Sequence, residues 1–149
     1  MSEKVLISNR KAYHDYHIGD KIEAGIALVG TEVKSLRASK ANLTDGWVEI
    51  GDHGIFLCDI FINHYSHGNI QNHEETRKRP LLLNKREIVK LQRAIEEKGM
   101  TIVPTKIYLK GRHIKVEIAP AKGKKNYDKR ESQKKKDADR DIQRVMKNQ

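Results

Sequence analysis

Residues 101–119 read TIVPTKIYLKGRHIKVEIA, and this stretch decides the fold class. It predicts two strands that meet at a turn around Lys110-Gly111. In the second strand every other residue from Ile114 to Ile118 is apolar, a period of two that is typical of a strand with one buried face. Pro104 lacks the N–H that a sheet ladder needs, so it predicts an edge position or a bulge in the first strand.

Two earlier stretches predict further strands. In residues 21–29, KIEAGIALV, every other residue from Ile22 to Leu28 is expected on one buried face, alternating with Glu23, Gly25 and Ala27. Gly25 in the middle of this stretch indicates a bulge or the close approach of another backbone. Residues 47–63, WVEIGDHGIFLCDIFIN, predict a hairpin whose turn lies at 51–54.

Helices are predicted in two places. The clearest is 84–98, NKREIVKLQRAIEEK, where Asn84 and Glu87 form a capping-box pair and Gly99 suits the position after the last turn. A shorter helix is predicted with Thr31 as its cap. It would turn Val33 and Leu36 inward and expose Lys34, Arg37 and Lys40.

The pattern as a whole predicts a mainly β fold, an antiparallel barrel with short flanking helices. The oligonucleotide-binding (OB) barrel is the commonest fit, although pattern alone leaves the topology open. The barrel is expected to span residues 1–119, with an ordered arm or short strand in 1–20 and a long polar loop at 63–80. Residues 120–149 are expected to form a separate basic tail.

The tail carries most of the excess charge. It holds 11 Lys or Arg against 5 Asp or Glu, which is +6 of the formal net charge of +10. From Ala138 to Met146 a narrow apolar stripe recurs at helical spacing among the charges. A short charged helix is marginal in water, so the tail is expected to be disordered when free and helical when docked in a negatively charged channel or groove. The alternative is a solubilising tail, which would have no use for the stripe.

Composition argues against membrane and secreted proteins. No apolar run approaches the roughly 20 residues that a spanning helix needs, and the N-terminal stretch lacks the apolar core of a signal peptide. The single cysteine, Cys58, cannot form an internal disulfide. A cytoplasmic protein is therefore predicted.

The sequence contains no constellation for catalysis. Cys58, His64, His67 and His73 lack the spacing of a zinc finger, and they are interpreted as a core thiol and surface histidines. No phosphate-binding loop and no paired acid and base stand out. The protein is therefore predicted not to be an enzyme and to use no cofactor, metal ion or small-molecule substrate.

The net charge favours a nucleic-acid partner, because phosphates attract clustered lysine and arginine. Aromatic residues make up only 5% of the chain, which disfavours an unpaired strand stacked on many rings. A folded RNA that is read through its backbone and shape fits better. Glu23 and Glu32 suit such a site only if they accept from an amino group or a 2′-OH or orient a lysine; otherwise they are solvated surface residues.

Three blocks of sequence resemble the SsrA-binding protein (SmpB) family of bacteria. They are NRKAYHDYHIGDKIEAGIALVGTEVKSLR at 9–37, RPLLLNKREIVKL at 79–91 and AKGKKNYDKRE at 121–131. The resemblance runs from about Ser8 to the last residue. It implies an OB-type barrel that binds the tRNA-like domain of transfer-messenger RNA (tmRNA). It also implies delivery of that RNA to the A site of stalled ribosomes for trans-translation, in which incomplete proteins are tagged for degradation.

The resemblance also implies which residues act. The RNA-binding set would be Asn9, Arg10, Glu23, Glu32, Lys34, Arg37, Leu82, Asn84 and Lys115. The ribosome-interacting tail set would be Lys122, Lys124, Lys125, Asp128, Lys129, Arg130, Val145 and Met146. The tail would probe the empty messenger channel, with Val145 and Met146 as its apolar pair.

Two prolines depart from the family pattern. Pro80 stands where the family often has lysine, which weakens one charge contact, and Pro120 is expected to end the last strand early. The main alternative is a general RNA-binding barrel that binds single strands independently of the tail. A nuclease or metal hydrolase that uses the three histidines is the third class.

Overall fold

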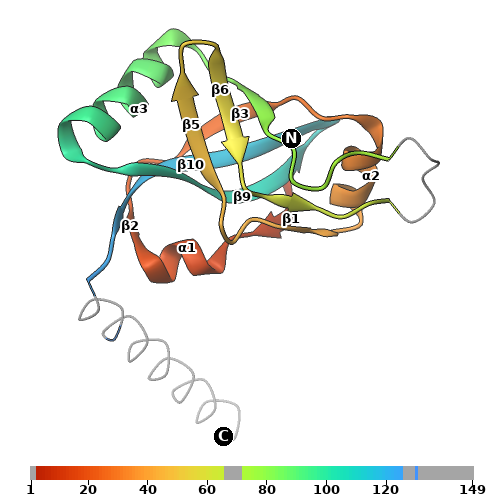
Figure 1. The fold of residues 1–149 in the computed structure, drawn as a ribbon. Coiled ribbons are helices and arrows are strands. Elements are labelled where there is room, and N and C mark those ends of the chain that lie inside the picture. The colour runs from red at the N-terminus through yellow and green to blue at the C-terminus, as the bar shows by residue number, and fades with distance from the viewer. Residues whose placement is uncertain (1–2, 66–71, 126–129, 131–149) are drawn as a thin grey trace, which may run out of the picture.

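The two strands predicted from residues 101–119 are the longest in the structure, a computed structural model that describes residues 3–65, 72–125 and 130 (Figure 1). Gly111 has a φ of +60° in the turn between them, a backbone conformation that favours glycine. In chain order the elements are β1 (Glu3–Ser8), α1 (Arg10–Asp15), β2 (Tyr16–Ile18), β3 (Ile22–Ile26), α2 (Gly30–Arg37), β4 (Ala41–Asn42), β5 (Trp47–Gly51), β6 (Gly54–Cys58), β7 (Phe61–Ile62), β8 (Arg79–Leu82), α3 (Lys85–Lys98), β9 (Thr101–Lys110) and β10 (His113–Gly123).

All strand pairs are antiparallel, and the main sheet has the order β1-β9-β10-β3-β8-β6-β5. β2 pairs with the end of β10, and β4 pairs with β7 in a small separate sheet. Leu6 of β1 and Val48 of β5 stand at opposite ends of the strand order, yet both belong to one core cluster. The sheet therefore curls around its core, and the predicted mainly β, barrel-like class is confirmed, with the ladders among the described residues leaving the barrel open between β1 and β5.

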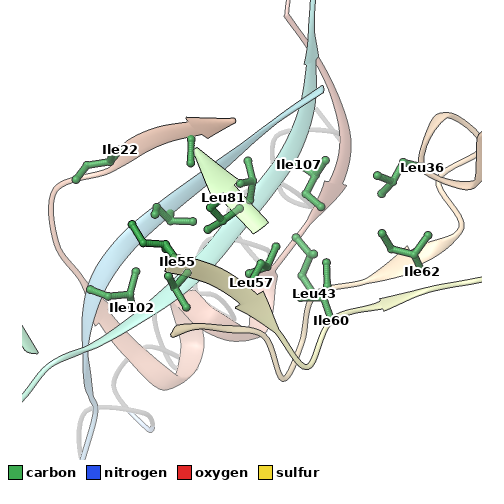
Figure 2. Close-up of a cluster of buried hydrophobic side chains, with 14 of the residues drawn as sticks. Ile22, Leu36, Leu43, Ile55, Leu57, Ile60, Ile62, Leu81, Ile102 and Ile107 are labelled. Atoms are coloured by element: carbon green, nitrogen blue, oxygen red, sulfur yellow. The ribbon is translucent and has the colours of Figure 1, made fainter. Parts of the chain in front are cut away.

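The core joins inward side chains of the strands to Leu36 of α2 and to Leu43 and Ile60 between strands (Figure 2). Ile107, Val116 and Ile118 have no exposed surface, and Leu91 of α3 is equally buried against the same cluster. Burying one such side chain contributes about 1.5–3 kcal/mol. The period of two therefore holds over 115–118 of β10, whereas residues 102–105 of β9 and 118–121 of β10 are buried in consecutive runs, where both faces are covered.

α3 follows its prediction at both ends. Asn84 accepts from the backbone N–H of Glu87 at 3.0 Å, and the Glu87 carboxylate accepts from the N–H of Asn84 at 3.2 Å. Gly99 ends the helix in the left-handed conformation.

In α2 the predicted cap is wrong: Val29 is the N-cap and Thr31 lies inside the first turn. Glu32 there accepts from the N–H of Val29 at 2.9 Å, and this contact replaces the Thr31 cap.

Prolines and loops account for the other differences. Pro104 lies beside a bulge between β9 and β10, as predicted. Pro120 does not end β10, which continues to Gly123, because Pro120 needs no N–H there and its carbonyl accepts from Gly19. The last strand of the sheet therefore runs three residues past Pro120, the start expected for the tail. The stretch 63–80 is not one loop to its end, since β8 begins at Arg79.

Candidate nucleic-acid interface

The outer face of the sheet brings together residues that are far apart in the sequence. Val5, Tyr108, Lys115, Gly25 and Leu82 stand in register across β1, β9, β10, β3 and β8. Their chain neighbours on β9 and β10 point into the core, so this row points outward.

Gly25 gives this row its shape. A Cβ atom there would lie 3.2 Å from Cβ of Leu82, which is tighter than ordinary contact. The close neighbour of Gly25 is therefore a side chain, where the sequence left open a bulge or another backbone. Leu82 is 69% exposed, and beside Lys115 it offers an apolar surface next to a positive charge.

Glu23 lies on the same outer face and is held by two neighbours on β9. It accepts from the hydroxyl of Tyr108 at 2.5 Å and from Nζ of Lys110 at 3.3 Å. The Tyr108 hydrogen bond, followed by Lys110, holds the pKa of Glu23 below its usual value. Burial, and then the bond to Glu23, raises the pKa of Tyr108. Glu23 therefore stays ionised, with carboxylate surface left to accept from an amino group or a ribose hydroxyl.

A hollow of about 280 Å³ adjoins this face. Its lining joins the sheet to α2 and to the β9–β10 turn, and consists of Gly25, Ile26, Leu28, Val33, Leu82, Arg112, His113, Ile114 and Lys115. Lys34 and Arg37 are exposed on α2, which reaches the hollow through Val33. Asn84 is exposed two residues after Leu82, although its side chain also caps α3. Arg112 and His113 are members of this surface that sequence reasoning missed.

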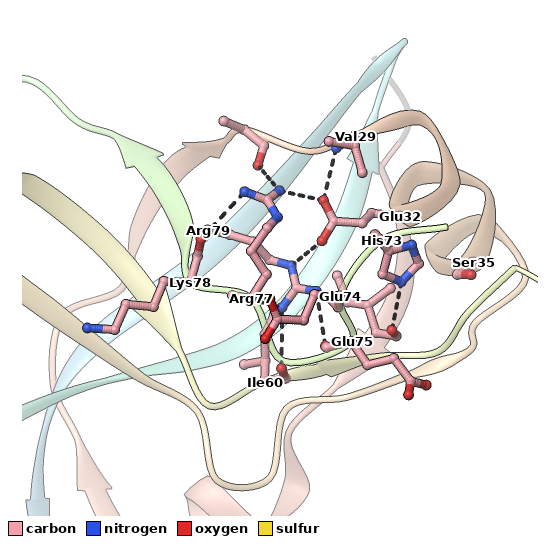
Figure 3. A network of polar contacts seen from close by, with 12 residues as sticks. Val29, Glu32, Ser35, Ile60, His73, Glu74, Glu75, Arg77, Lys78 and Arg79 are labelled. Atoms are coloured by element: carbon pink, nitrogen blue, oxygen red, sulfur yellow. Dashed lines mark hydrogen bonds and ion pairs between the residues drawn. The ribbon is translucent and has the colours of Figure 1, made fainter. Parts of the chain in front are cut away.

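Glu32 is a different case, because it lies in the interior between two arginines (Figure 3). It has no exposed surface, and its two oxygens accept from Arg77 and Arg79 at 2.5 Å each. Arg79 is equally buried and also donates to the carbonyl groups of Ile60, Arg77, Glu74 and Glu75. Glu32 therefore presents no surface to an RNA in this structure, and its predicted contact with RNA stays a prediction. This network of Glu32, Arg77 and Arg79 ties α2 to the chain that leads into β8.

The network settles the charge of Glu32. Burial alone would raise the pKa of the carboxyl, but hydrogen bonds from Arg77, Val29 and Arg79 outweigh it and hold the pKa below its usual value. Burial in turn lowers the pKa of Arg79, an effect that its bonds to Glu32 oppose. Glu32 and Arg79 therefore remain an ion pair inside the protein.

Asn9 is also buried, with only 4% of its surface exposed. Its side-chain amide donates to the carbonyl groups of Leu43 at 3.1 Å and Pro104 at 2.8 Å, and its oxygen accepts from Ala12 at the start of α1. These bonds occupy the polar atoms of Asn9 within the fold, and its contact with RNA stays a prediction. Arg10 is exposed on α1 and does not line the hollow beside Leu82.

The predicted tail residues divide into two groups. Lys122 and Lys125 are exposed, whereas Lys124 is half-buried and its Nζ donates to the carbonyl of Tyr13 at 3.0 Å. Arg130 is exposed. Asp128, Lys129, Val145 and Met146, together with the predicted order of the tail on docking, lie outside the described residues.

Of the four residues considered as zinc ligands, Cys58, His64 and His73 lie in the described part of the chain, and His67 lies outside it. His73 is buried, where surface histidines were expected, because its ring contacts the hydroxyl of Thr31 and the carbonyl of Ile62 at 2.8 Å each. Cys58 is buried, as expected of a core thiol, and burial raises its pKa. Within residues 3–65 and 72–125 no group of three possible metal ligands gathers.

None of the described helices is long and apolar enough to cross a membrane.

A family model described as SmpB protein matches residues 6–148 of this chain. The chain belongs to the SmpB family. Two relatives are both called SsrA-binding protein. The one from Carboxydothermus hydrogenoformans is 51% identical over 144 residues, which is 97% of each chain. The one from Pelobacter propionicus is 51% identical over 99% of this chain and 97% of its own.

A solved structure gives the same result in three dimensions. It is described as "tmRNA-SmpB: a journey to the center of the bacterial ribosome", and the matching chain is 45% identical with a TM-score of 0.68. The match covers 80% of this chain and 85% of the other. The SmpB fold is therefore shared in sequence and in backbone arrangement.

Replacing Glu32 with glutamine should destabilise this SmpB chain by about 3–5 kcal/mol, because Arg79 would keep its buried charge without a counter-charge. The pKa of Glu32 is lowered by folding, so its contribution is present above the unfolded-state pKa of about 4.3. That contribution is lost as pH falls through the folded-state pKa. Urea unfolding at pH 7 and at pH 3 measures both effects, and the difference between the two proteins should shrink at pH 3.

The matched control is Glu49→Gln, which breaks the exposed pair of Glu49 and Lys78 at 2.8 Å. Solvent screens that pair, so little change is expected at either pH. Equal destabilisation by the two variants would contradict the structural role assigned to Glu32.

Proposed function

We propose that this chain binds the tRNA-like domain of tmRNA and delivers it to stalled ribosomes for trans-translation. The observation that carries the proposal is similarity over nearly the whole chain to proteins called SsrA-binding protein, SsrA RNA being tmRNA. A solved relative described as tmRNA-SmpB in the bacterial ribosome supports the same partners. The chain acts as a binding protein without a catalytic step, in the cytoplasm where ribosomes work.

The outer sheet face is the surface that fits the RNA. Lys115 supplies charge for a phosphate, and Leu82 supplies apolar surface for a ribose or base edge. Glu23, held ionised by Tyr108, supplies a hydrogen-bond acceptor for an amino group or a ribose hydroxyl. A phosphate is itself an acceptor, so it would not bind there. A surface with all three properties reads the shape and groups of a folded RNA better than a bare cationic patch does.

The C-terminal residues take the second role. Their charge, +6 over residues 120–149, suits a path lined by rRNA phosphates, and an empty messenger channel is such a path. A messenger in the channel would exclude them by volume. In this proposal the RNA-binding face holds tmRNA while the tail reports that the channel is vacant.

The test is a comparison of two RNAs with the full-length chain. The affinity for the tRNA-like domain of tmRNA should exceed the affinity for an unstructured single strand of equal length by about 10³-fold or more at physiological salt. Equal affinities would contradict the proposal and favour a general RNA-binding barrel.

Two substitutions on the outer face should have separable effects. Lys115→Ala should weaken binding and reduce the slope of log affinity against log salt by about 1, because one phosphate contact is lost. Leu82→Ala should weaken binding with the slope unchanged, because it removes apolar contact only. Filter binding at several salt concentrations measures both.

Lys98→Ala is the control for these two variants. Lys98 is exposed at the far end of α3, about 20 Å along the helix from Asn84. It should leave affinity and slope unchanged. If Lys98→Ala weakened RNA binding as much as Lys115→Ala does, the RNA would bind to positive charge anywhere on the surface and not to the outer sheet face.

Truncation after Lys125 should separate the two roles. It keeps all of β10 and the contacts of Lys124, unlike a cut at Pro120. The affinity for tmRNA should stay within about twofold, because the phosphate contacts of the sheet face remain, and tagging of a stalled ribosome's product should be lost. Loss of both together would show that the tail is needed for the RNA grip itself.

A further inference from the structure

The C-terminal end of β10 is held differently from the rest of the strand. Its last pair with β3 is Ile118 with Ile22, and its last pair with β9 is Ala121 with Thr101. From Lys122 to Gly123 its ladder partner is β2, where Lys122 pairs with His17 and Gly123 with Tyr16. The end of β10 therefore pairs with β2 of the N-terminal segment, past the points where its pairing with β3 and β9 stops.

Lys124 extends this hold by one residue. Its backbone N–H donates to the carbonyl of Asp15 at 2.8 Å, and its Nζ donates to the carbonyl of Tyr13 at 3.0 Å. Both acceptors lie in α1 (Figure 1). Residues 9–18, which comprise Asn9, α1 and β2, are called the strap below.

The strap is itself fastened to the barrel at its first residue. Asn9 bridges the carbonyl groups of Leu43 and Pro104, and its backbone N–H donates to Thr105 at 2.8 Å. Ala12 packs with Val103 and Ala121 in a small cluster of its own. A two-stranded ribbon alone is marginal in water, so these fastenings decide whether β2 can hold the end of β10.

We propose that the strap is a positioning device, with Asn9 as its fastening residue, and that it fixes where and in which direction the residues after Lys125 leave the barrel. The inference rests on the proposed function, in which tmRNA is held by one surface and the ribosome is met by another. Two linked contacts help each other only when the connection between them suits the distance and the direction. The buried Asn9 would then serve the tail and not the RNA-binding face.

Two variants test the strap in the full-length protein. Asn9→Ser keeps a cap for α1 but is too short to reach both carbonyl groups. Hydrogen exchange at the Lys124 amide should become about tenfold faster, with β3 and β8 unchanged. Insertion of Gly-Ser-Gly-Ser after Lys125 leaves the strap intact and frees the direction beyond it. Both variants should keep the tmRNA affinity of the unaltered protein and lower the tagging rate by about tenfold, because the two contacts are no longer matched.

The control is the same insertion between Asp52 and His53, in the turn of the β5–β6 hairpin, which should leave tagging unchanged. Tagging at the unaltered rate by the variant with the insertion after Lys125 would overturn the inference, even if Asn9→Ser fails to fold. Faster exchange throughout the Asn9→Ser protein, with no excess at Lys124, would also overturn it. Failure of the unaltered protein to bind tmRNA would overturn the proposed function first, and the two failures are therefore distinguishable.

Discussion

The hydrogen-bonded ladder of β10 is the constraint on which the rest of the structure depends. This one strand pairs with β9, β3 and β2, and together the three ladders hold it from His113 to Gly123, on both sides over 115–118. It carries Lys115 near its start and ends at Gly123. Lys122 lies seven positions after Lys115 in the strand, which is about 23 Å. A stiff strand of that length joins the proposed RNA-binding face to the base of the tail at a fixed separation.

A second constraint is the buried network of Glu32, Arg77 and Arg79. Charges in the interior are costly unless each has a partner, and here the carboxylate and the buried guanidinium of Arg79 satisfy each other while the backbone carbonyls take the remaining donors. The network fastens α2 beside β8, and the hollow next to Leu82 lies between these elements. The buried network therefore holds α2 and β8 in place on the two sides of this hollow, which belongs to the candidate binding surface.

Local signals in the sequence predicted α3 and most of the strands, but they placed the cap of α2 wrongly and missed the helix α1. The caps at Asn84 and Gly99 could be predicted because the groups they bond lie within a few residues of them. The strands could be predicted from apolar residues at every other position. Burial was not readable where it depends on distant partners: Glu32 meets Arg79 across 47 positions, and Asn9 meets Pro104 across 95. Resemblance to a family marks such residues as important without saying whether they touch RNA or support the fold. The same limit applies to Pro120, whose strand continues because β2 supplies a partner that pattern did not predict.

The most direct test of the division between face and strap is the change in backbone amide chemical shifts when the tRNA-like domain of tmRNA is added to the full-length protein. Changes should gather on the outer sheet, around Glu23, Leu82 and Lys115, and should leave Tyr16, His17 and Lys124 at their free positions. The largest changes in the strap, with none on the outer sheet, would contradict the account.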